Sequence, residues 1–508
     1  MRATLSLRST AGQATRTVED LDPDPKNGTF FVRYSSTYPF KSHNVNALER
    51  EDPELQTCQH QCRHQERFDE REQRECEQRC EEYHKEKQWR QREREDEEEE
   101  EEEEQYEYNP YLFDEESWKT TIDEEEGRVR VLERFTKKSK LLRGIDNFRV
   151  SIYEANPRTF SVPNHWDAES VSFVTRGYGT ISLVKHDNRE TFNIKRGDIL
   201  RIPAGTIVYL VNKDNHEKLQ IIDFVHAFSV PGHFETFFGP GGEGNPESFF
   251  RAFNIEILTA AFSVCREKVE RLFGQTKMGV FLRASEKQIR ELTKHASSSE
   301  GGLWLFGGGN KSSGAFNLFD KKPSISNNYG KLHEVKPHEF KDLPKLDVGV
   351  SFVNISRGAM AGPYFNTRAV KVAVVVQGKG FFEMACPHEH QEGQWQREKE
   401  SGPHYHKVRG NMSPGVVFVT LPGHPVVVVA SNDENLQVVV FKINSEHNER
   451  IPVAGNENVI QQLEKEAKEL SFGLPEKEVD EVFNNQRESY FFPGPHQRQR
   501  HGGGRASA

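Results

Sequence analysis

The sequence predicts a mainly β protein built from two tandem β-sandwich or β-barrel units, each followed by helices. Short runs of β-branched residues separated by Gly, Pro and Asn turns indicate the strands, and an internal duplication indicates two copies. A polar N-terminal region with paired cysteines and an acidic run predicts a separate segment ahead of the two units.

The duplication is visible in two stretches that keep a constant spacing. FVTRGYGTISLV and VVVQGKGFFEMA align with Gly177 on Gly378, an offset of 201. Farther along, seven apolar positions repeat at an offset of 210 without a gap, from Phe249 on Val459 to Phe273 on Phe483. Chance similarity would not hold one register over so many apolar positions, so we infer a duplicated unit.

Each copy has strands first and helices second. GDILRIPAGTIVYLVN and GVVFVTLPGHPVVVVASN are typical of strands joined by tight turns, and many such strands favour a sandwich or closed barrel. The helical stretches that follow carry more large apolar residues than their own barrel needs. We expect another subunit to cover these arms, with head-to-tail contacts that close into a ring. Cys265 is expected to be a buried thiol in an arm helix.

Six segments are predicted along the 508 residues. In chain order they are an unassigned, disordered segment (1–50), a cysteine hairpin with an acidic linker (51–105), the first barrel with its helical arm (106–294), a Gly/Ser-rich linker (295–330), the second barrel with its arm (331–491) and a disordered tail (492–508).

Four cysteines in the polar N-terminal region have the spacing C-x3-C-x13-C-x3-C. Cysteines four residues apart lie on one face of a helix, so two antiparallel helices would join outer to outer and inner to inner. The predicted disulfides of this helical hairpin are Cys58–Cys80 and Cys62–Cys76, and they imply an oxidising compartment.

The charge pattern argues against a nucleic-acid partner. Ten of the 79 acidic residues form one run from Glu95 to Glu104, and the remaining 69 nearly balance the 68 Lys and Arg residues. No apolar run has the ~18–20 residues that a membrane span needs, so no membrane partner is expected. The start of the chain lacks the apolar core of a signal peptide; we interpret it as a chain without its true N-terminus, with a transit peptide as the alternative.

Several motifs resemble those of a known family. GDILRIPAG, with Gly197, Pro203, Gly205 and Asn212, resembles the second motif of the cupin barrel. NPYLF, EANPRTF, MAGPYFNTRA and FFPGP are similar to signatures of the 7S vicilin-like seed storage globulins. The resemblance covers about residues 51–495 and implies two jelly-roll-type cupin barrels.

The resemblance also implies a biological role. Members of the family are homotrimers joined through helical arms, reach protein-storage vacuoles through the secretory pathway, and are degraded at germination for nitrogen and carbon. Many are food allergens, so IgE antibodies are an expected partner. Because no signal peptide is visible in this chain, its localisation rests on the resemblance alone.

Enzymatic cupins hold a metal with three histidines and a glutamate. The first copy offers His165 alone, Val208 occupies the position of the second-motif histidine, and Val426 occupies the corresponding position in the second copy. No catalytic residue is therefore expected, and His165 is interpreted as a rim or hydrogen-bonded histidine.

A different metal site is predicted in MACPHEHQEG. Cys386 and His388 would face the same side of a strand, and His424 lies in a turn that a barrel returns to the same rim. A thiolate with two imidazoles suits copper, with zinc as the alternative. Some vicilins are similar in holding copper with Cys-x-His, Gly-His-Pro and a tyrosine, which implies Tyr111 as the last ligand, with Tyr108 behind it. The plainer interpretation is a half-buried cysteine beside loop histidines; His390, His404 and His406 are expected to be solvated loop residues.

Two other roles compete with storage, and four acceptor motifs predict modification. The cysteine hairpin resembles segments released as antimicrobial or protease-inhibiting peptides, and a copper site could serve a redox enzyme. Asn-x-Ser/Thr motifs mark glycosylation candidates at Asn354, Asn310, Asn411 and Asn27, with Asn310 and Asn411 expected in exposed loops.

Overall fold

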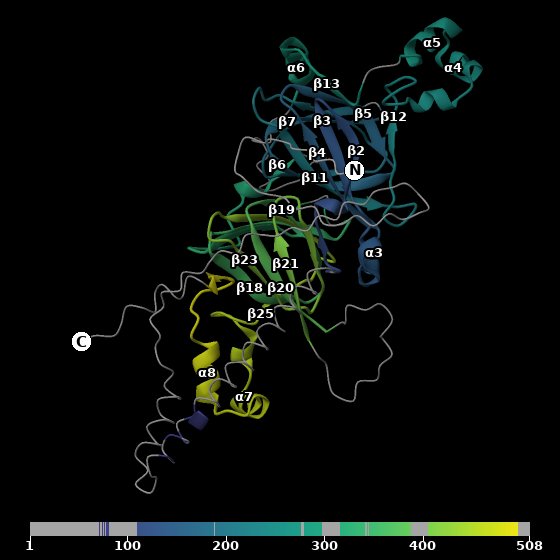
Figure 1. Ribbon diagram of the computed structural model, residues 1–508. Coiled ribbons are helices and arrows are strands. Elements are labelled where there is room, and N and C mark those ends of the chain that lie inside the picture. The colour runs from purple at the N-terminus through teal and green to yellow at the C-terminus, as the bar shows by residue number, and fades with distance from the viewer. Residues whose placement is uncertain are drawn as a thin grey trace, which may run out of the picture. The chain divides into compact units, whose positions relative to one another are not determined.

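The computed structural model describes residues 109–495 except 187, 276–278, 297–314, 341–342, 344 and 388–404, and six residues between 71 and 80. The chain divides into two compact units, residues 1–95 and 96–508. In the second unit the strands form four sheets, two for each barrel (Figure 1). The prediction of a mainly β protein with two tandem barrels and helical arms is confirmed.

The first barrel consists of a seven-stranded and a six-stranded sheet with antiparallel pairing. Their orders are β14-β9-β6-β11-β4-β3-β2 and β12-β5-β10-β7-β8, with β13 added to β5. The strands are β2 (Trp118–Glu124), β3 (Gly127–Leu132), β4 (Phe148–Ala155), β5 (Thr159–Trp166), β6 (Ala168–Arg176), β7 (Tyr178–Lys185), β8 (Asn188–Lys195), β9 (Asp198–Ile202), β10 (Ile207–Asn212), β11 (Leu219–Ala227), β12 (Thr236–Phe238), β13 (Phe281–Arg283) and β14 (Phe316–Asn317).

The second barrel repeats this plan. Its sheets have the orders β1-β22-β19-β24-β17-β16-β15 and β21-β20-β23-β18-β25, with β26 added to β18. The strands are β1 (Leu112–Phe113), β15 (Ile325–Asn327), β16 (Gly330–Val335), β17 (Val348–Ile355), β18 (Ala359–Asn366), β19 (Val370–Gln377), β20 (Gly380–Cys386), β21 (His406–Met412), β22 (Val417–Thr420), β23 (Val426–Ala430), β24 (Leu436–Ile443), β25 (Arg450–Pro452) and β26 (Phe491–Pro493).

The helical arms reproduce the predicted offset of 210 residue by residue. The first arm is η3 (Phe249–Ala252), α4 (Ile255–Phe262) and α5 (Arg266–Phe273), and the second is η7 (Val459–Gln462), α7 (Lys465–Phe472) and α8 (Glu476–Phe483). The other helices are η1 (Glu115–Ser117), α3 (Phe135–Lys138), η2 (Lys140–Ile145), α6 (Glu286–Thr293), η5 (Leu318–Asp320) and η6 (Pro337–Glu339). No helix in the described part of the chain has the length and apolar character for a membrane crossing.

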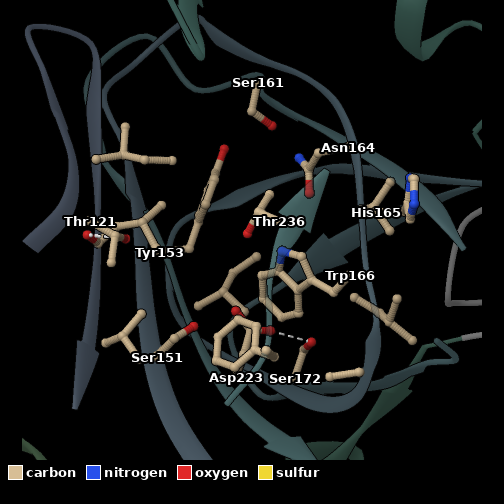
Figure 2. Close-up of a pocket in the computed structure, with 18 of the residues that line it drawn as sticks. Thr121, Ser151, Tyr153, Ser161, Asn164, His165, Trp166, Ser172, Asp223 and Thr236 are labelled. Carbon is tan, nitrogen blue, oxygen red and sulfur yellow. Dashed lines mark hydrogen bonds between the residues drawn. The ribbon is translucent and has the colours of Figure 1, made fainter. Parts of the chain in front are cut away.

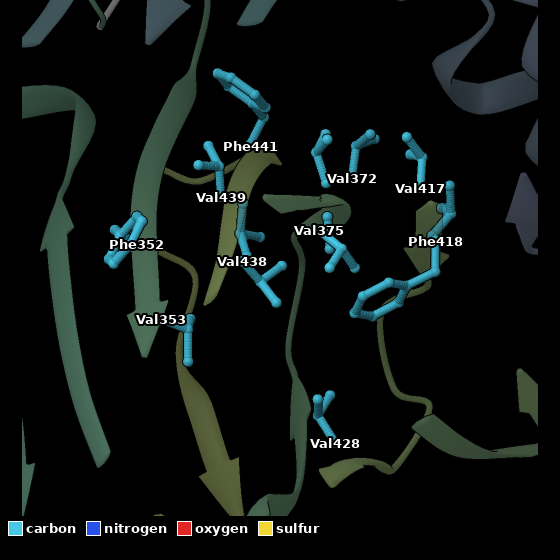
Figure 3. Close-up of a cluster of buried hydrophobic side chains, with 14 of the residues drawn as sticks. Phe352, Val353, Val372, Val375, Val417, Phe418, Val428, Val438, Val439 and Phe441 are labelled. Carbon is cyan, nitrogen blue, oxygen red and sulfur yellow. The ribbon is translucent and has the colours of Figure 1, made fainter. Parts of the chain in front are cut away.

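A large cluster of buried β-branched and aromatic side chains forms the main apolar core. Figure 3 shows this core in the second barrel, where Val438 and Phe441 come from β24 and Val372 and Val375 from β19. Phe224 of the first barrel stacks on Phe441 of the second with ring centroids 4.8 Å apart. One apolar cluster therefore joins the two barrels, because residues from both contribute to it.

Two short strands cross between the barrels. β1 precedes the first barrel in sequence but pairs with β22 of the second. In the same way, β14 comes just before β15 of the second barrel in sequence but pairs with β9 of the first. The predicted segment 106–294 contains β1 and the predicted linker 295–330 contains β14, and the exchange of these two strands is a finding of the structure. A strand that adds to a sheet edge pairs with whichever edge lies beside it in the fold, which can belong to a distant part of the sequence.

Other predictions are corrected or lie outside the described residues. Cys265 is exposed at the N-terminus of α5, where the prediction had a buried thiol. Asn411 is exposed but lies in strand β21 and not in a loop, and Asn354 is half-buried in β17. The other two glycosylation candidates, Asn27 and Asn310, lie outside the described residues.

The N-terminal unit is described only in part. Cys76 and Cys80 lie on one helical segment, and both are disulfide-bonded. Their predicted partners, Cys58 and Cys62, lie outside the described residues, so the pairing Cys58–Cys80 and Cys62–Cys76 stays a prediction.

Candidate metal centre

Cys386 ends strand β20 at a point where a turn of the chain returns beside it. β20 pairs with β23 through Met384 and Val426, and the amide of Ala385 donates to the carbonyl of Pro425 at 2.9 Å. This pairing brings the turn that contains His424 next to Cys386. The predicted convergence of these two side chains at one rim is what the strand pairing produces.

Tyr111 reaches the same point from the other end of the chain. The side chain of Asn109 accepts from the amide of Tyr111 at 2.9 Å and donates to the carbonyl of Arg409 at 2.9 Å, which fixes the segment on the second barrel. The Tyr111 hydroxyl lies 3.4 Å from Cys386 Sγ. Tyr111 is 0% and Cys386 1% exposed, so the two groups meet away from bulk water.

The electrostatics of the three groups are coupled. Burial, followed by the contact with Cys386, raises the pKa of the Tyr111 hydroxyl well above its usual range. Burial alone would lower the pKa of His424, but the hydrogen bonds with Cys386 and with the Pro422 carbonyl outweigh it, so the pKa is raised. His424 Nδ1 lies 2.9 Å from the Pro422 carbonyl and donates to it, so in the neutral ring Nε2 carries the lone pair.

His406 was predicted to be a solvated loop residue, and the structure shows that this prediction is wrong. It begins strand β21, directly opposite Cys386, and opposed residues of an antiparallel pair present their side chains to the same face. Its Nε2 is buried and has no hydrogen-bond partner within the described residues. His388, the remaining predicted ligand, lies outside the described residues, as do His390 and His404. The part of the chain that the structure describes contains no group of three or more His, Cys, Asp and Glu ligands.

Comparison with known proteins identifies the architecture. The family model described as Cupin matches residues 113–270 and 316–480. A vicilin of Juglans regia is 51% identical over an alignment of 481 positions, which covers 91% of this chain and 95% of that protein. The chain belongs to the vicilin family. Vicilins are the two-barrel 7S globulins, as the repeated Cupin match and the duplicated sheets require.

Solved vicilin structures agree with the fold. The crystal structure of the Corylus avellana vicilin has a TM-score of 0.68 at 48% identity and covers 76% of this chain and all of that one. A Solanum melongena vicilin, whose crystal structure is described as having different anionic ligands in structurally similar pockets, has a TM-score of 0.71 at 39% identity over 76% of this chain and 98% of that one. A Macadamia integrifolia protein named vicilin-like antimicrobial peptides 2-1 is 46% identical over 77% of this chain and 59% of its own length.

In this vicilin the residues around Cys386 fit a soft metal ion. A thiol, an imidazole and a phenol converge at one buried point, and each becomes a better ligand when it loses its proton. The carbonyl bond to His424 Nδ1 is the outer contact that usually fixes a ligating ring. The same three groups also satisfy one another by hydrogen bonding, which is the plainer interpretation of the site.

Sequence reasoning missed two buried charged groups. Asp223 lies inside the first barrel, and Glu334 lies in the second among Lys371, Lys442 and Arg450. Asp223 carried a signal, because it is a charged residue within the apolar run IIDFV of β11. Glu334 carried none, because its strand β16, GKLHEV, is polar in sequence. His165 lies on β5, half-buried and stacked on Phe237 with centroids 5.1 Å apart, while Val208 lines the first barrel's cavity.

Proposed function

We propose that this vicilin is a seed storage protein, a reserve of nitrogen and carbon that is kept in protein-storage vacuoles and degraded at germination. Its membership of the vicilin family carries the proposal. The test is to follow the protein through seed filling and germination with an antibody and to locate it by immunogold microscopy. Accumulation in vacuoles followed by loss at germination is expected; a constant level in all tissues would contradict storage. Binding by serum IgE, a further expectation, is measured with the same purified protein.

The storage form is proposed to be a homotrimer held by the arms. The arms leave large apolar side chains in water: Ile257, Phe262 and Leu272 on the first, and Leu470, Phe472, Leu474 and Val482 on the second. Leu470 is 87% exposed and Val482 72%. Several large apolar side chains exposed on each arm support a protein interface there, and two such arms on one chain favour a closed ring.

Light scattering after size exclusion tests the trimer. The native protein is expected at three times the chain mass of 58.5 kDa. Leu470→Glu should shift it toward smaller species because a charge would be buried in the interface, while Leu470→Met keeps the apolar area and should leave the trimer intact. A trimer that tolerates Leu470→Glu at micromolar concentration would refute the arm interface.

A copper ion is proposed at the site of Cys386, His388, His424 and Tyr111, with zinc as the alternative. The convergence of three of these groups at one buried point supports it. Bound copper would supply one-electron redox chemistry. The protein's own residues would exclude water from the ion and tie β1 to the second barrel, so we favour a structural or storage role over an enzymatic one.

Elemental analysis and electron paramagnetic resonance of protein prepared without chelator test this site. About one copper per chain with a thiolate-type spectrum is expected, and Cys386→Ser should remove both. Cys265→Ser is the matched control, because that thiol is exposed on an arm. Equal metal in both variants would refute the site. Turnover of a redox substrate that Cys386→Ser abolishes would instead favour the enzymatic alternative.

The second barrel is also proposed to bind a small anion. Lys371 and Lys442, each about 5–6% exposed, lie with Arg450 around a single carboxylate, that of Glu334. A cavity of about 30 Å³ between Lys371, Tyr364 and Thr420 limits the ligand to a few atoms. The anionic ligands described for the Solanum melongena vicilin support the same chemistry.

Thermal unfolding in increasing acetate tests the anion site. The unfolding temperature should rise with acetate and not with matched sodium chloride, because binding to the native state stabilises it. Lys371→Met should remove that dependence. An acetate effect that persists in Lys371→Met would refute the assignment.

The N-terminal hairpin is proposed as a second functional part, released as an antimicrobial or protease-inhibiting peptide. The disulfides of Cys76 and Cys80 and the name of the Macadamia relative support this proposal. The oxidised peptide of residues 51–90 should inhibit microbial growth or a protease at low micromolar concentration, and its reduced form should not. Equal inactivity of both forms would leave the hairpin a structural extension.

A further inference from the structure

The first barrel encloses a cavity of about 500 Å³ that the storage function does not use. Its walls are mostly apolar, with Ile181, Val208, Ile221 and Phe281 among the lining residues. A volume of this size, with a few polar groups among apolar walls, is typical of sites for small organic molecules. The question is which molecule the polar groups would select.

At one end of the cavity lies a carboxyl group that forms no ion pair with any cation among the described residues. Asp223 is 6% exposed, and Ser172 Oγ donates to its Oδ1 at 2.5 Å (Figure 2). Arg149 on the neighbouring strand β4, which also lines the cavity, instead donates to the backbone carbonyls of Leu132 and Gly232. Burial raises the pKa of Asp223 to about 6, and no cation contributes to that shift.

At the other end stands a phenol. Figure 2 shows the Tyr153 hydroxyl pointing away from Asp223, toward Ser161 and Asn164. Burial raises the pKa of Tyr153 and of Asp223, and two contacts act against it: the Tyr153 hydroxyl faces Ser161, and at the opposite end Ser151 Oγ faces Asp223. Within the described residues neither hydroxyl has a partner at hydrogen-bond geometry. Ser161 Oγ already accepts from the amide of Leu210 at 3.1 Å. Buried hydroxyls are normally hydrogen-bonded, so Tyr153 indicates a polar ligand group at this end and Ser151 one at the Asp223 end.

The second barrel carries its charged groups at different interior positions. Asp223 pairs with Ser172 in the first barrel, and Val440 pairs with Ala373 in the same place in the second. A second pair lies two residues farther along the same strands. It is Ser170 with Val225 in the first barrel and Lys371 with Lys442 in the second. The first interior therefore has Asp223 where the second has Val440, and it has Ser170, Val225 and Val131 where the second has Lys371, Lys442 and Glu334. The two interiors are not expected to prefer the same ligand.

We propose that the cavity of the first barrel binds a hydroxylated arylalkylamine, an organic cation with its ammonium at Asp223 and its hydroxyl at Tyr153. An ammonium would donate to Asp223 and to the hydroxyls of Ser151 and Ser172. The ring would lie against the apolar walls, where Val208 and Phe281 are found. The ligand hydroxyl would complete the hydrogen bonding of Tyr153 at the opposite end.

Affinity for such an amine depends on the ionisation of Asp223. The titratable and charged groups facing the cavity are Tyr153 and Arg149 on β4, His165 on β5, Lys119 on β2, and His233 and Glu235 before β12. Of these, Lys119 is exposed and His233 pairs with Glu235 at 3.0 Å. A cation requires the ionised carboxylate, so binding should be about tenfold weaker near pH 5 than near pH 7.5.

Isothermal titration calorimetry of the full chain with three matched probes tests the proposal. Tyramine is the cation, tyrosol the neutral alcohol and 4-hydroxyphenylacetate the anion of nearly the same shape. We expect tyramine to bind most tightly at pH 7.5, and Asp223→Asn to weaken it by at least about tenfold. Asp123→Asn, an exposed position on β2, is the matched control and should bind tyramine as the parent chain does.

A second variant separates loss of binding from loss of folding. Val208→Phe fills the cavity from β10 and leaves Asp223 in place, so it should also lose tyramine while circular dichroism shows a folded protein. The proposal is overturned if tyrosol or 4-hydroxyphenylacetate binds as tightly as tyramine. It is also overturned if none of the three binds, or if folded Asp223→Asn keeps the parent affinity.

Discussion

The buried carboxylate of Glu334 gives a sharp pH prediction. Glu334 Oε2 lies 2.6 Å from Lys442 Nζ and 3.2 Å from an Arg450 guanidinium nitrogen. Burial alone would raise its pKa, but Lys442, Arg450 and Lys371 outweigh burial and lower the pKa from 4.5 to about 2. A depression of this size corresponds to about 3 kcal/mol of stability. Because the native pKa is the lower one, that stability is present above pH 4.5 and is lost as the pH falls toward 2.

Glu334→Gln removes both the charge and its pH dependence. At pH 7 Lys442 and Arg450 would lose the carboxylate with which they pair, so the free energy of unfolding should fall by about 3–5 kcal/mol. Between pH 4.5 and 2 the variant should lose about 3 kcal/mol less than the parent. Urea unfolding followed by tryptophan fluorescence, at fixed protein concentration, measures both values.

Glu449→Gln is the matched control, since Glu449 is exposed beside Arg450. Its unfolding free energy should follow the parent at every pH. If Glu334→Gln and the parent instead lose stability in parallel below pH 4.5, the cluster does not hold the Glu334 pKa down and the reasoning fails.

Three further predictions concern the strand exchange, one turn and the first barrel. Phe113→Ala should destabilise the protein by about 3–5 kcal/mol in urea unfolding, because Phe113 is 0% exposed and packs edge-to-face on Phe135; a loss under 1 kcal/mol would mean that β1 is dispensable. Gly378→Ala should lower the free energy of unfolding by about 2 kcal/mol or more, because Gly378 has φ +85° and a Cβ there would lie 2.1 Å from the Asn435 carbonyl oxygen. Gly423→Ala is the control, since Gly423 has φ +76° but open space around it, and calorimetry should show a smaller loss. The native pKa of Asp223 is raised from 3.8 to about 6, so the free energy of unfolding should fall by about 3 kcal/mol as the pH rises from 3.8 to 6. Asp223→Asn should abolish that fall. If the fall persists in Asp223→Asn, another group causes it.

The duplicated architecture could be predicted from sequence because local patterns encode it. Apolar residues at a constant offset of 210 predicted that two sets of helices are equivalent, η3, α4 and α5 in the first copy and η7, α7 and α8 in the second. Strands β13 and β26 keep the same offset. Gly177 and Gly378 marked equivalent turns, and both have positive φ. Strand alternation and turn chemistry act over a few residues, so a single sequence carries them.

What the sequence left open depends on neighbours far along the chain. Strand β1 could join either barrel, and only the sheet edge offered by β22 decided it. Distant neighbours also decided three other features: the exposure of Cys265, the position of His406 opposite Cys386, and the charges inside the barrels. Cys386 and His424 were predicted to converge, but their contact with Tyr111 required β1 to cross to the second barrel. Burial and the ionisation of a buried group are properties of the space around a side chain, and that space is assembled only when distant strands pair.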